Sequence, residues 1–280
     1  MSKNLKGFPM IKMPSKEELS ERVRKRFLSD NENPNNLSFW FEKIKDCGFP
    51  VPETRVIPLT FEWYEWIRSD NYKPEKIEEF SVFIIEKLKE SNFNTDRTLF
   101  LKSGTFSNKF QFNQCKLEDI GRIGHQCLEI MYTSMLFGAD KTAEIIVREF
   151  IHNPVSKKCI YEGMPLNTEF RIFYDFDKKA VMGSFNYWKR DVMMESLEKR
   201  IHDETSKNEY DNFMESIDAI EFEYNENIAK LINEVSEKMF PVELTGKWSI
   251  DFMKIEDKFY LIDMAIASES YYFNELNENG

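Results

Sequence analysis

The chain closes with the sequence WSIDFMKI-ED-KFYLIDMA at residues 248–265, and this stretch decides the fold. Two apolar runs on either side of a polar pair predict a β-hairpin. Asp251 and Asp263 are equally distant from Asp257, so in a symmetric hairpin they face each other with Cβ atoms about 4.5–5.5 Å apart. Facing carboxylates repel unless a cation or a proton lies between them, and Mg²⁺ prefers such oxygens. We expect a metal-binding pair; alternatively, one or both aspartates face solvent or pair with a lysine.

A loop with a lysine at each end lies upstream. Residues 97–104 (RTLFLKSG) predict a strand that ends at Lys102 and continues into a polar loop as far as Lys109. A loop rich in Gly, Ser and Thr can bind phosphate through its backbone N–H groups and two flanking charges. The GxxxxGK[ST] and GxGxxG motifs are absent from the sequence. The alternative is an ordinary polar loop with solvated lysines.

The apolar strand predicted at residues 144–151 (EIIVREFI) is interrupted by Arg148 and Glu149. Buried charges are costly, so we expect these two side chains either to pair internally or to bind a ligand.

A further hairpin is predicted from residues 169–176 and 180–188, joined by a charged turn. Glu169 and Arg171 alternate onto one face of its first strand, and aromatic residues occupy the other face. Arg171 therefore either reaches a phosphate or pairs with Glu169.

Helices dominate the first third of the chain. Ser15 begins a capping box, Thr60 caps an aromatic helix, and Pro74 stands at a helix-starting position. A short strand is expected at residues 54–59. Further helices are expected at residues 37–47, 75–91, 117–137 and over most of 190–239. The order, helices followed by antiparallel strands, predicts an α+β protein.

Composition narrows the function classes. The 280 residues carry a formal net charge of −11, which argues against a dedicated duplex-DNA binder. No apolar run approaches the roughly 20 residues of a membrane span, and the first residues do not resemble a secretory signal. Four widely spaced cysteines suit a reducing compartment, so we expect a cytoplasmic protein. Three histidines make a multi-histidine metal site unfavourable.

The order of these motifs resembles the ATP-grasp superfamily, and is closest to divergent phage and bacterial members and to the eukaryotic chaperone that assembles translation initiation factor 2. The matching pieces lie between residues 36 and 272. The resemblance implies two α+β subdomains that clamp a nucleotide, preceded by a helical region. The expected divisions are residues 1–95 (helical region), 96–150 (lid subdomain) and 151–280 (C-terminal subdomain with the metal-binding hairpin).

The resemblance also implies roles for individual residues. Asp251 and Asp263 would bind Mg²⁺, and Lys109 and Arg171 would assist catalysis. One departure concerns Ala265, which stands where many members have an asparagine metal ligand. The residues implied for ATP are Lys102, Ser107, Lys109, Arg148, Glu149, Phe150, Ile151 and Arg171.

Three functions follow as hypotheses. The first is an ATP- and Mg²⁺-dependent ligase that activates a carboxylate as an acyl phosphate for attack by an amine or similar nucleophile. Its unknown acceptor is a small molecule or a protein. The second is an ATP-binding assembly chaperone without ligase turnover. A distant third is a ligase that forms lysyl-AMP, suggested by Tyr161-Glu162-Gly163, although Lys102 lies in KSG and not KxxG.

Overall fold

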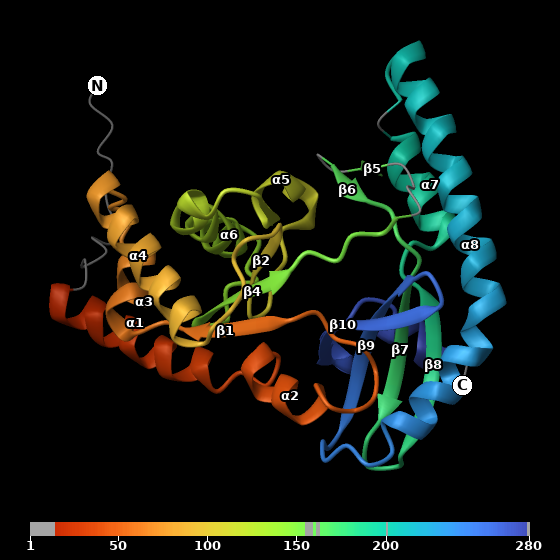
Figure 1. Ribbon diagram of the computed structural model, residues 1–280, viewed down its shortest axis with the longest axis horizontal. Helices are drawn as coiled ribbons and strands as arrows, with labels where there is room; N and C mark the ends of the chain where they lie inside the picture. Colours follow the sequence, from red (N-terminus) through yellow and green to blue (C-terminus); the bar gives the residue numbers. More distant parts are fainter. Residues whose placement is uncertain (1–14, 155–158, 161–162, 200, 279–280) are drawn as a thin grey trace, which may run out of the picture.

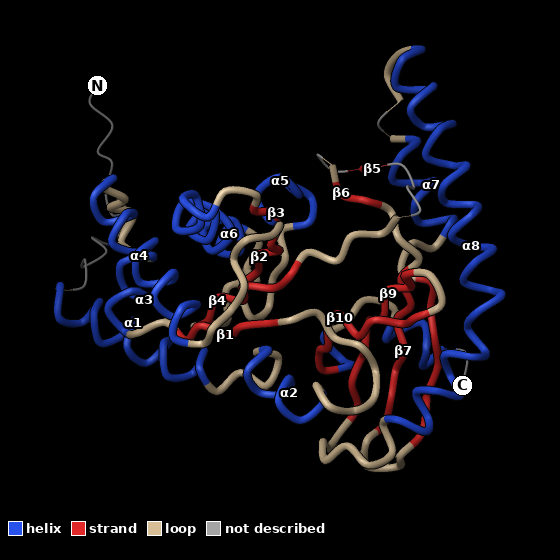
Figure 2. Tube along the Cα trace, viewed as in Figure 1, coloured by secondary structure: helices blue, strands red, loops and turns tan. Residues whose placement is uncertain are grey.

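The computed structural model describes residues 15–154, 159–160, 163–199 and 201–278, which form two α+β lobes lying side by side (Figure 1). Each lobe is built on a four-stranded sheet whose paired strands are antiparallel. Figure 2 shows that helices flank both sheets on the outside, while strands and loops meet between the lobes. The predicted α+β class is confirmed.

The first lobe has the strand order β1-β4-β2-β3. Leu101 and Val147 point from its central strands into a buried core with the covering helices. Its strands are β1 (Thr54–Pro58), β2 (Leu99–Ser103), β3 (Lys116–Leu117) and β4 (Glu144–Glu149). Its helices are α1 (Lys16–Asn31), α3 (Phe61–Ile67), α4 (Pro74–Glu90) and α6 (Ile123–Leu136).

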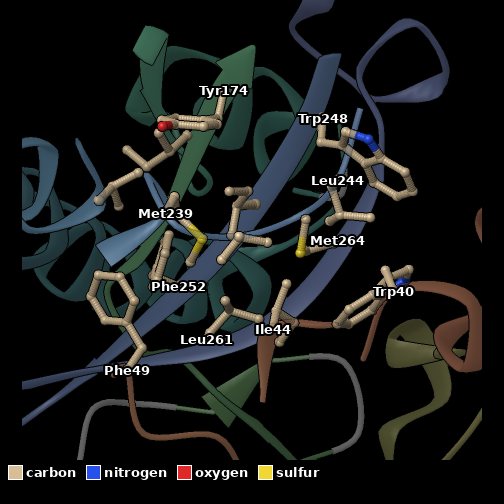
Figure 3. Close-up of a cluster of buried hydrophobic side chains, with 14 of the residues drawn as sticks. Trp40, Ile44, Phe49, Tyr174, Met239, Leu244, Trp248, Phe252, Leu261 and Met264 are labelled. Carbon is tan, nitrogen blue, oxygen red and sulfur yellow. The ribbon is translucent and has the colours of Figure 1, made fainter. Parts of the chain in front are cut away.

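The second lobe has the strand order β10-β9-β7-β8. Figure 3 shows its core, in which Phe252 and Leu261 from the sheet lie with Trp40 and Ile44 from helix α2. Its strands are β7 (Glu169–Asp175), β8 (Ala180–Asn186), β9 (Lys247–Ile255) and β10 (Lys258–Ile266). Its helices are α2 (Leu37–Ile44) and the long α8 (Glu204–Lys238).

Short elements connect and flank the lobes. They are the 3₁₀ helices η1 (Lys109–Gln111), η2 (Ile120–Arg122) and η3 (Ala267–Glu269), the strands β5 (Cys159–Ile160) and β6 (Met164–Pro165), and the helices α5 (Phe112–Cys115), α7 (Arg190–Glu198) and α9 (Phe273–Glu278). No helix in the described ranges has the length and apolar character needed to cross a membrane.

Local signals in the sequence are confirmed at several helix starts. The Ser15 hydroxyl accepts a hydrogen bond from the Glu18 amide, and the Thr60 hydroxyl accepts one from the Trp63 amide. The helix predicted at residues 117–137 begins later, at Ile123. The Asp119 carboxylate accepts from the Gly121 amide at 2.9 Å and forms a local turn, which competes with helix formation.

The first sheet crosses the expected boundary at residue 95. Strand β1 precedes that boundary, yet it pairs along β4 from Thr54 to Pro58. Residues before and after the boundary also share one buried core, which includes Ile57, Phe80 and Leu99. Residues 54–95 therefore pack with the sheet and core of the first lobe.

Strand alternation decides which side chains face the other lobe. On β7, Phe170 and Ile172 enter the second core, so Glu169 and Arg171 lie on the opposite face. On β2, Leu101 enters the first core and leaves Lys102 on the face that borders the second lobe. The same period-two rule therefore places charged residues of both lobes at the junction.

Candidate functional site

A pocket lies between the lobes, and nine of the ten site residues predicted from sequence line it. Its apolar part includes Phe100, Phe150 and Met253. Arg171 is the predicted residue that it lacks, and Arg171 lines a second, adjoining pocket. The predicted residues in the first pocket are Lys102, Ser107, Lys109, Arg148, Glu149, Phe150, Ile151, Asp251 and Asp263.

Lys102 is more buried than a residue at a strand end was expected to be. It is 3 % exposed, and its Nζ donates to Asp263 Oδ2 at 2.5 Å. Burial lowers the pKa of Lys102, and the neighbouring Asp263 opposes that change. Burial alone would raise the pKa of Asp263, but Lys102 and Arg148 hold it below its ordinary value. The pair joins strand β2 of the first lobe to strand β10 of the second.

Asp251 and Asp263 are Cα partners in the hairpin, as predicted, and of the alternatives the structure shows a lysine partner for Asp263. Asp251 accepts two hydrogen bonds from Arg171, at 2.8 Å from Nε and 2.7 Å from Nη2. Asp263 accepts from Lys102. Each carboxylate thus has its own cation, which removes the cause of mutual repulsion. Of the two alternatives for Arg171, pairing with Glu169 is replaced by pairing with Asp251.

The facing of the two aspartates depends on a β-bulge. From the turn outward the strands pair one residue to one, as far as Leu261 opposite Phe252. If this register continued, the next pair would place Ile262 opposite Asp251. The register shifts between Leu261 and Asp263, so Ile262 is the extra residue. Its carbonyl accepts a hydrogen bond from Nη1 of Arg148. One irregularity therefore aligns the carboxylates and supplies an acceptor to the other lobe.

Lys109 and Glu169 lie at the other side of the pocket. Lys109 Nζ lies 3.8 Å from the ring centroid of Tyr187, and the Trp188 indole N–H donates to Glu169 Oε1 at 3.3 Å. Burial raises the pKa of Glu169, and Lys109 opposes that shift. Burial alone would lower the pKa of Lys109, but Tyr187, Glu169 and Asp251 raise it. Lys109 thus provides positive charge beside the buried carboxylate of Glu169.

Glu149 and Arg148 have different partners within the same strand. The Glu149 carboxylate accepts from Arg97 Nη1 at 2.7 Å and from the Glu53 amide at 3.0 Å. Arg148 is 5 % exposed, and its Nε has no hydrogen-bond partner among the described residues. Internal pairing therefore accounts for Glu149, whereas the guanidinium of Arg148 retains capacity for a ligand.

The second pocket is polar and shares three residues with the first, namely Lys102, Asp251 and Asp263. Ser249, Glu269 and Ser270 line its far side. Its loop wall includes Gly104, where a Cβ would lie 2.4 Å from Thr142 Oγ1 and 2.5 Å from Glu144 Oε1. A side chain there would have to displace the buried side chains of Thr142 and Glu144, so this position favours glycine. The ion pairs of the shared residues stand where the two pockets meet.

The donor set fits a Mg²⁺ ion that arrives with phosphate groups. The described residues contain no cluster of three or more metal-binding side chains, so the chain itself offers the two carboxylates of Asp251 and Asp263. Mg²⁺ commonly binds one or two carboxylates and completes its shell with phosphate oxygens and water. Both carboxylates already hold a positive group, Arg171 or Lys102, which stands in for such a cation.

Comparison with solved structures gives the fold. Cdc123 from Schizosaccharomyces pombe superposes with a TM-score of 0.50 at 15 % identity, covering 91 % of this chain and 92 % of that one. The chain therefore shares the overall fold of Cdc123. A RimK domain ATP-grasp protein from Sphaerobacter thermophilus (TM-score 0.38, 13 % identity) is matched over 92 % of this chain and 64 % of its own. D-Alanine-D-alanine ligase from Helicobacter pylori (TM-score 0.40, 13 % identity) is matched over 88 % and 56 %. No family model and no curated protein sequence matches.

Sequence reasoning missed several residues of the pocket between the lobes. Glu169 was considered as a partner of Arg171, and its alternation with Phe170 could have placed it in the cleft. Met164 and Asn167 also line the pocket, and no sequence signal marks these two residues. Tyr161 and Glu162, which suggested a lysyl-AMP ligase, lie outside the described residues.

Proposed function

We propose that the cleft binds ATP with Mg²⁺ and transfers the γ-phosphate to a carboxylate substrate. The observation that supports nucleotide binding is a single pocket with an apolar region and a group of cations and carboxylates. Phe100, Phe150 and Met253 offer the apolar surface that a base requires. Lys102 and Lys109 offer the positive charge that phosphates require.

The residues of the cleft have separate roles in this proposal. The adenine lies against the apolar wall, where the backbone of Phe150 and Ile151 supplies polar groups. Glu169 accepts hydrogen bonds from ribose hydroxyls, because it is a buried carboxylate on the same pocket wall. Asp251 and Asp263 hold Mg²⁺, which neutralises phosphate charge when bound.

The chemistry is an activation followed by a displacement. An oxygen of the substrate carboxylate attacks the γ-phosphorus, the bond to the bridging oxygen breaks, and ADP leaves. The product of this step is an acyl phosphate. An amine or similar nucleophile then attacks its acyl carbon, and phosphate departs with the bonding electron pair. Lys109 and Arg171 stabilise the negative charge that develops on the transferred group. The protein contributes positioning and charge stabilisation and forms no covalent intermediate with the substrate.

An assembly factor that binds ATP without ligase turnover is the second candidate. The fold likeness to Cdc123 and Ala265 at an expected ligand position favour it. ADP release over many equivalents of protein, measured with candidate carboxylates and amines, distinguishes the two. Sustained release supports the ligase, and stoichiometric ATP binding without release supports the assembly factor.

Calorimetry and thermal unfolding test nucleotide binding directly. ATP with Mg²⁺ at 100 times its dissociation constant should stabilise the protein by about 2.7 kcal/mol. Lys102→Met should weaken this binding about thirtyfold, because a charged hydrogen bond contributes about 2 kcal/mol. Lys87→Met is the matched control, since Lys87 is exposed on α4 and pairs with Glu90. If Mg²⁺ and ATP together give no heat and no thermal shift, the proposal is wrong.

A further inference from the structure

Two ion pairs occupy the place where the two pockets meet. Lys102 Nζ lies 2.5 Å from Asp263 Oδ2, and Arg171 Nη2 lies 2.7 Å from Asp251 Oδ2. In each pair, a cation proposed to act on phosphate holds a carboxylate proposed to bind Mg²⁺. Each carboxylate therefore occupies the place on the lysine or arginine where a phosphate would bind. Each lysine or arginine, in turn, occupies the place on the carboxylate where a metal ion would bind.

We propose that these pairs make the site accept a nucleotide and a divalent cation only together, by exchange of ionic partners. The inference rests on the proposed function and concerns how that site is controlled. When both ligands bind, Lys102 and Arg171 turn to phosphate oxygens, and Asp263 and Asp251 turn to the metal. Every charge that loses one partner gains another.

Either ligand alone breaks this balance. Free nucleotide would bind Lys102 and leave Asp263 beside the phosphates, where charges of the same sign repel. A free cation would bind Asp263 and leave Lys102, which is 3 % exposed, without a negative partner. A buried ionised group without a partner is costly. The same argument holds for Arg171 and Asp251, whose side chains are each 12 % exposed.

Among the described residues, the ionic groups next to Lys102 and Asp263 already have hydrogen-bond partners of their own. Arg148 is the next cation near Asp263, and its Nη1 is held by the Ile262 carbonyl. Glu144 is the other carboxylate near Lys102, and it accepts from the Ser38 amide at 3.2 Å. The coupling therefore depends on the four side chains of the two pairs.

Two mirror-image variants test this proposal by binding and do not depend on turnover. Asp263→Asn frees Lys102 from its anion, so it should bind ATP in the presence of EDTA about tenfold more tightly than wild type. Added Mg²⁺ should then improve its affinity far less than it does for wild type. Lys102→Met frees Asp263, so it should bind Mn²⁺ alone about tenfold more tightly, as followed by electron paramagnetic resonance.

Asp257→Asn is the control, because it makes the same charge change at an exposed turn position of the same hairpin. It should match wild type in both titrations. Circular dichroism shows which of the two variants are folded, and one folded variant is enough to test the proposal. A folded Asp263→Asn or Lys102→Met protein that shows no gain overturns the exchange of partners while leaving ATP binding intact. A wild-type protein that binds no ATP with Mg²⁺ overturns the proposed function and this inference together.

Discussion

The two lobes present opposite charges to the pocket that they share. The first lobe has one residue of the other sign, Glu149, which pairs with Arg97 of the same lobe. In the second lobe Asp251 pairs with Arg171, which lines the adjoining pocket. The charges left over attract across the cleft, as in Lys102 with Asp263. The remaining charges are Lys102, Lys109 and Arg148 in the first lobe and Glu169 and Asp263 in the second.

This difference assigns complementary tasks to the lobes. A surface of cations suits phosphate, and a surface of carboxylates suits a metal and hydroxyl donors. In the protein without ligand, Lys102 of the first lobe pairs with Asp263 of the second. The comparison predicts that substitutions within the second lobe affect stability, metal binding and ribose binding separately.

The largest effect is expected from Asp251→Asn in the protein without ligand. It removes the carboxylate from Arg171, and breaking a buried pair on one side should lower the free energy of unfolding by about 3 kcal/mol. Urea denaturation without metal measures this loss, with Asp257→Asn as the control of unchanged stability. A variant that is as stable as wild type, or more so, would show that carboxylate repulsion outweighs the pair.

The same hairpin shows how far the sequence could predict the site. The facing of Asp251 and Asp263 was predicted from symmetry about Asp257, yet the turn register alone places Ile262 opposite Asp251. The prediction is confirmed because a bulge adds one residue, and no rule of alternation locates a bulge. The types and order of residues were therefore sufficient to predict the fold class. They did not reveal the bulge that brings the two carboxylates opposite each other.

Burial and partner choice were harder to predict than position. Lys102 was expected to be accessible at a strand end, but the second lobe covers it and supplies Asp263. Arg171 had two candidate partners in the sequence, and its actual partner comes from β9, 80 residues away. The Lys102 contact depends on how the two sheets meet, and the Arg171 contact depends on which strands pair within the second sheet; local periodicity encodes neither arrangement.

A smaller effect is expected from Glu169→Gln, which tests the ribose contact of the second lobe. Loss of a charged acceptor should weaken ATP binding about tenfold, consistent with about 1.5 kcal/mol for a charged hydrogen bond. Competition binding should show that wild type prefers ATP to 2′-deoxy-ATP and that the variant does not. Glu226→Gln, exposed on α8, is the control. Preserved discrimination in Glu169→Gln would assign the ribose to another residue.

The smallest effect is expected from Ala265→Asn, which tests whether the second lobe lacks a metal ligand. Ala265 is two residues beyond Asp263, pairs with Ser249 and lines the second pocket, so its side chain shares the face of Asp263. An amide oxygen there should strengthen the Mg²⁺-dependent part of ATP binding about fivefold, as expected for a neutral contact of about 1 kcal/mol. Ala265→Leu matches asparagine in shape without the oxygen and should give no gain. If asparagine gives no gain either, the metal shell is completed by water or by the nucleotide. The second lobe then contributes only Asp251 and Asp263 to the metal, and the site has two protein ligands.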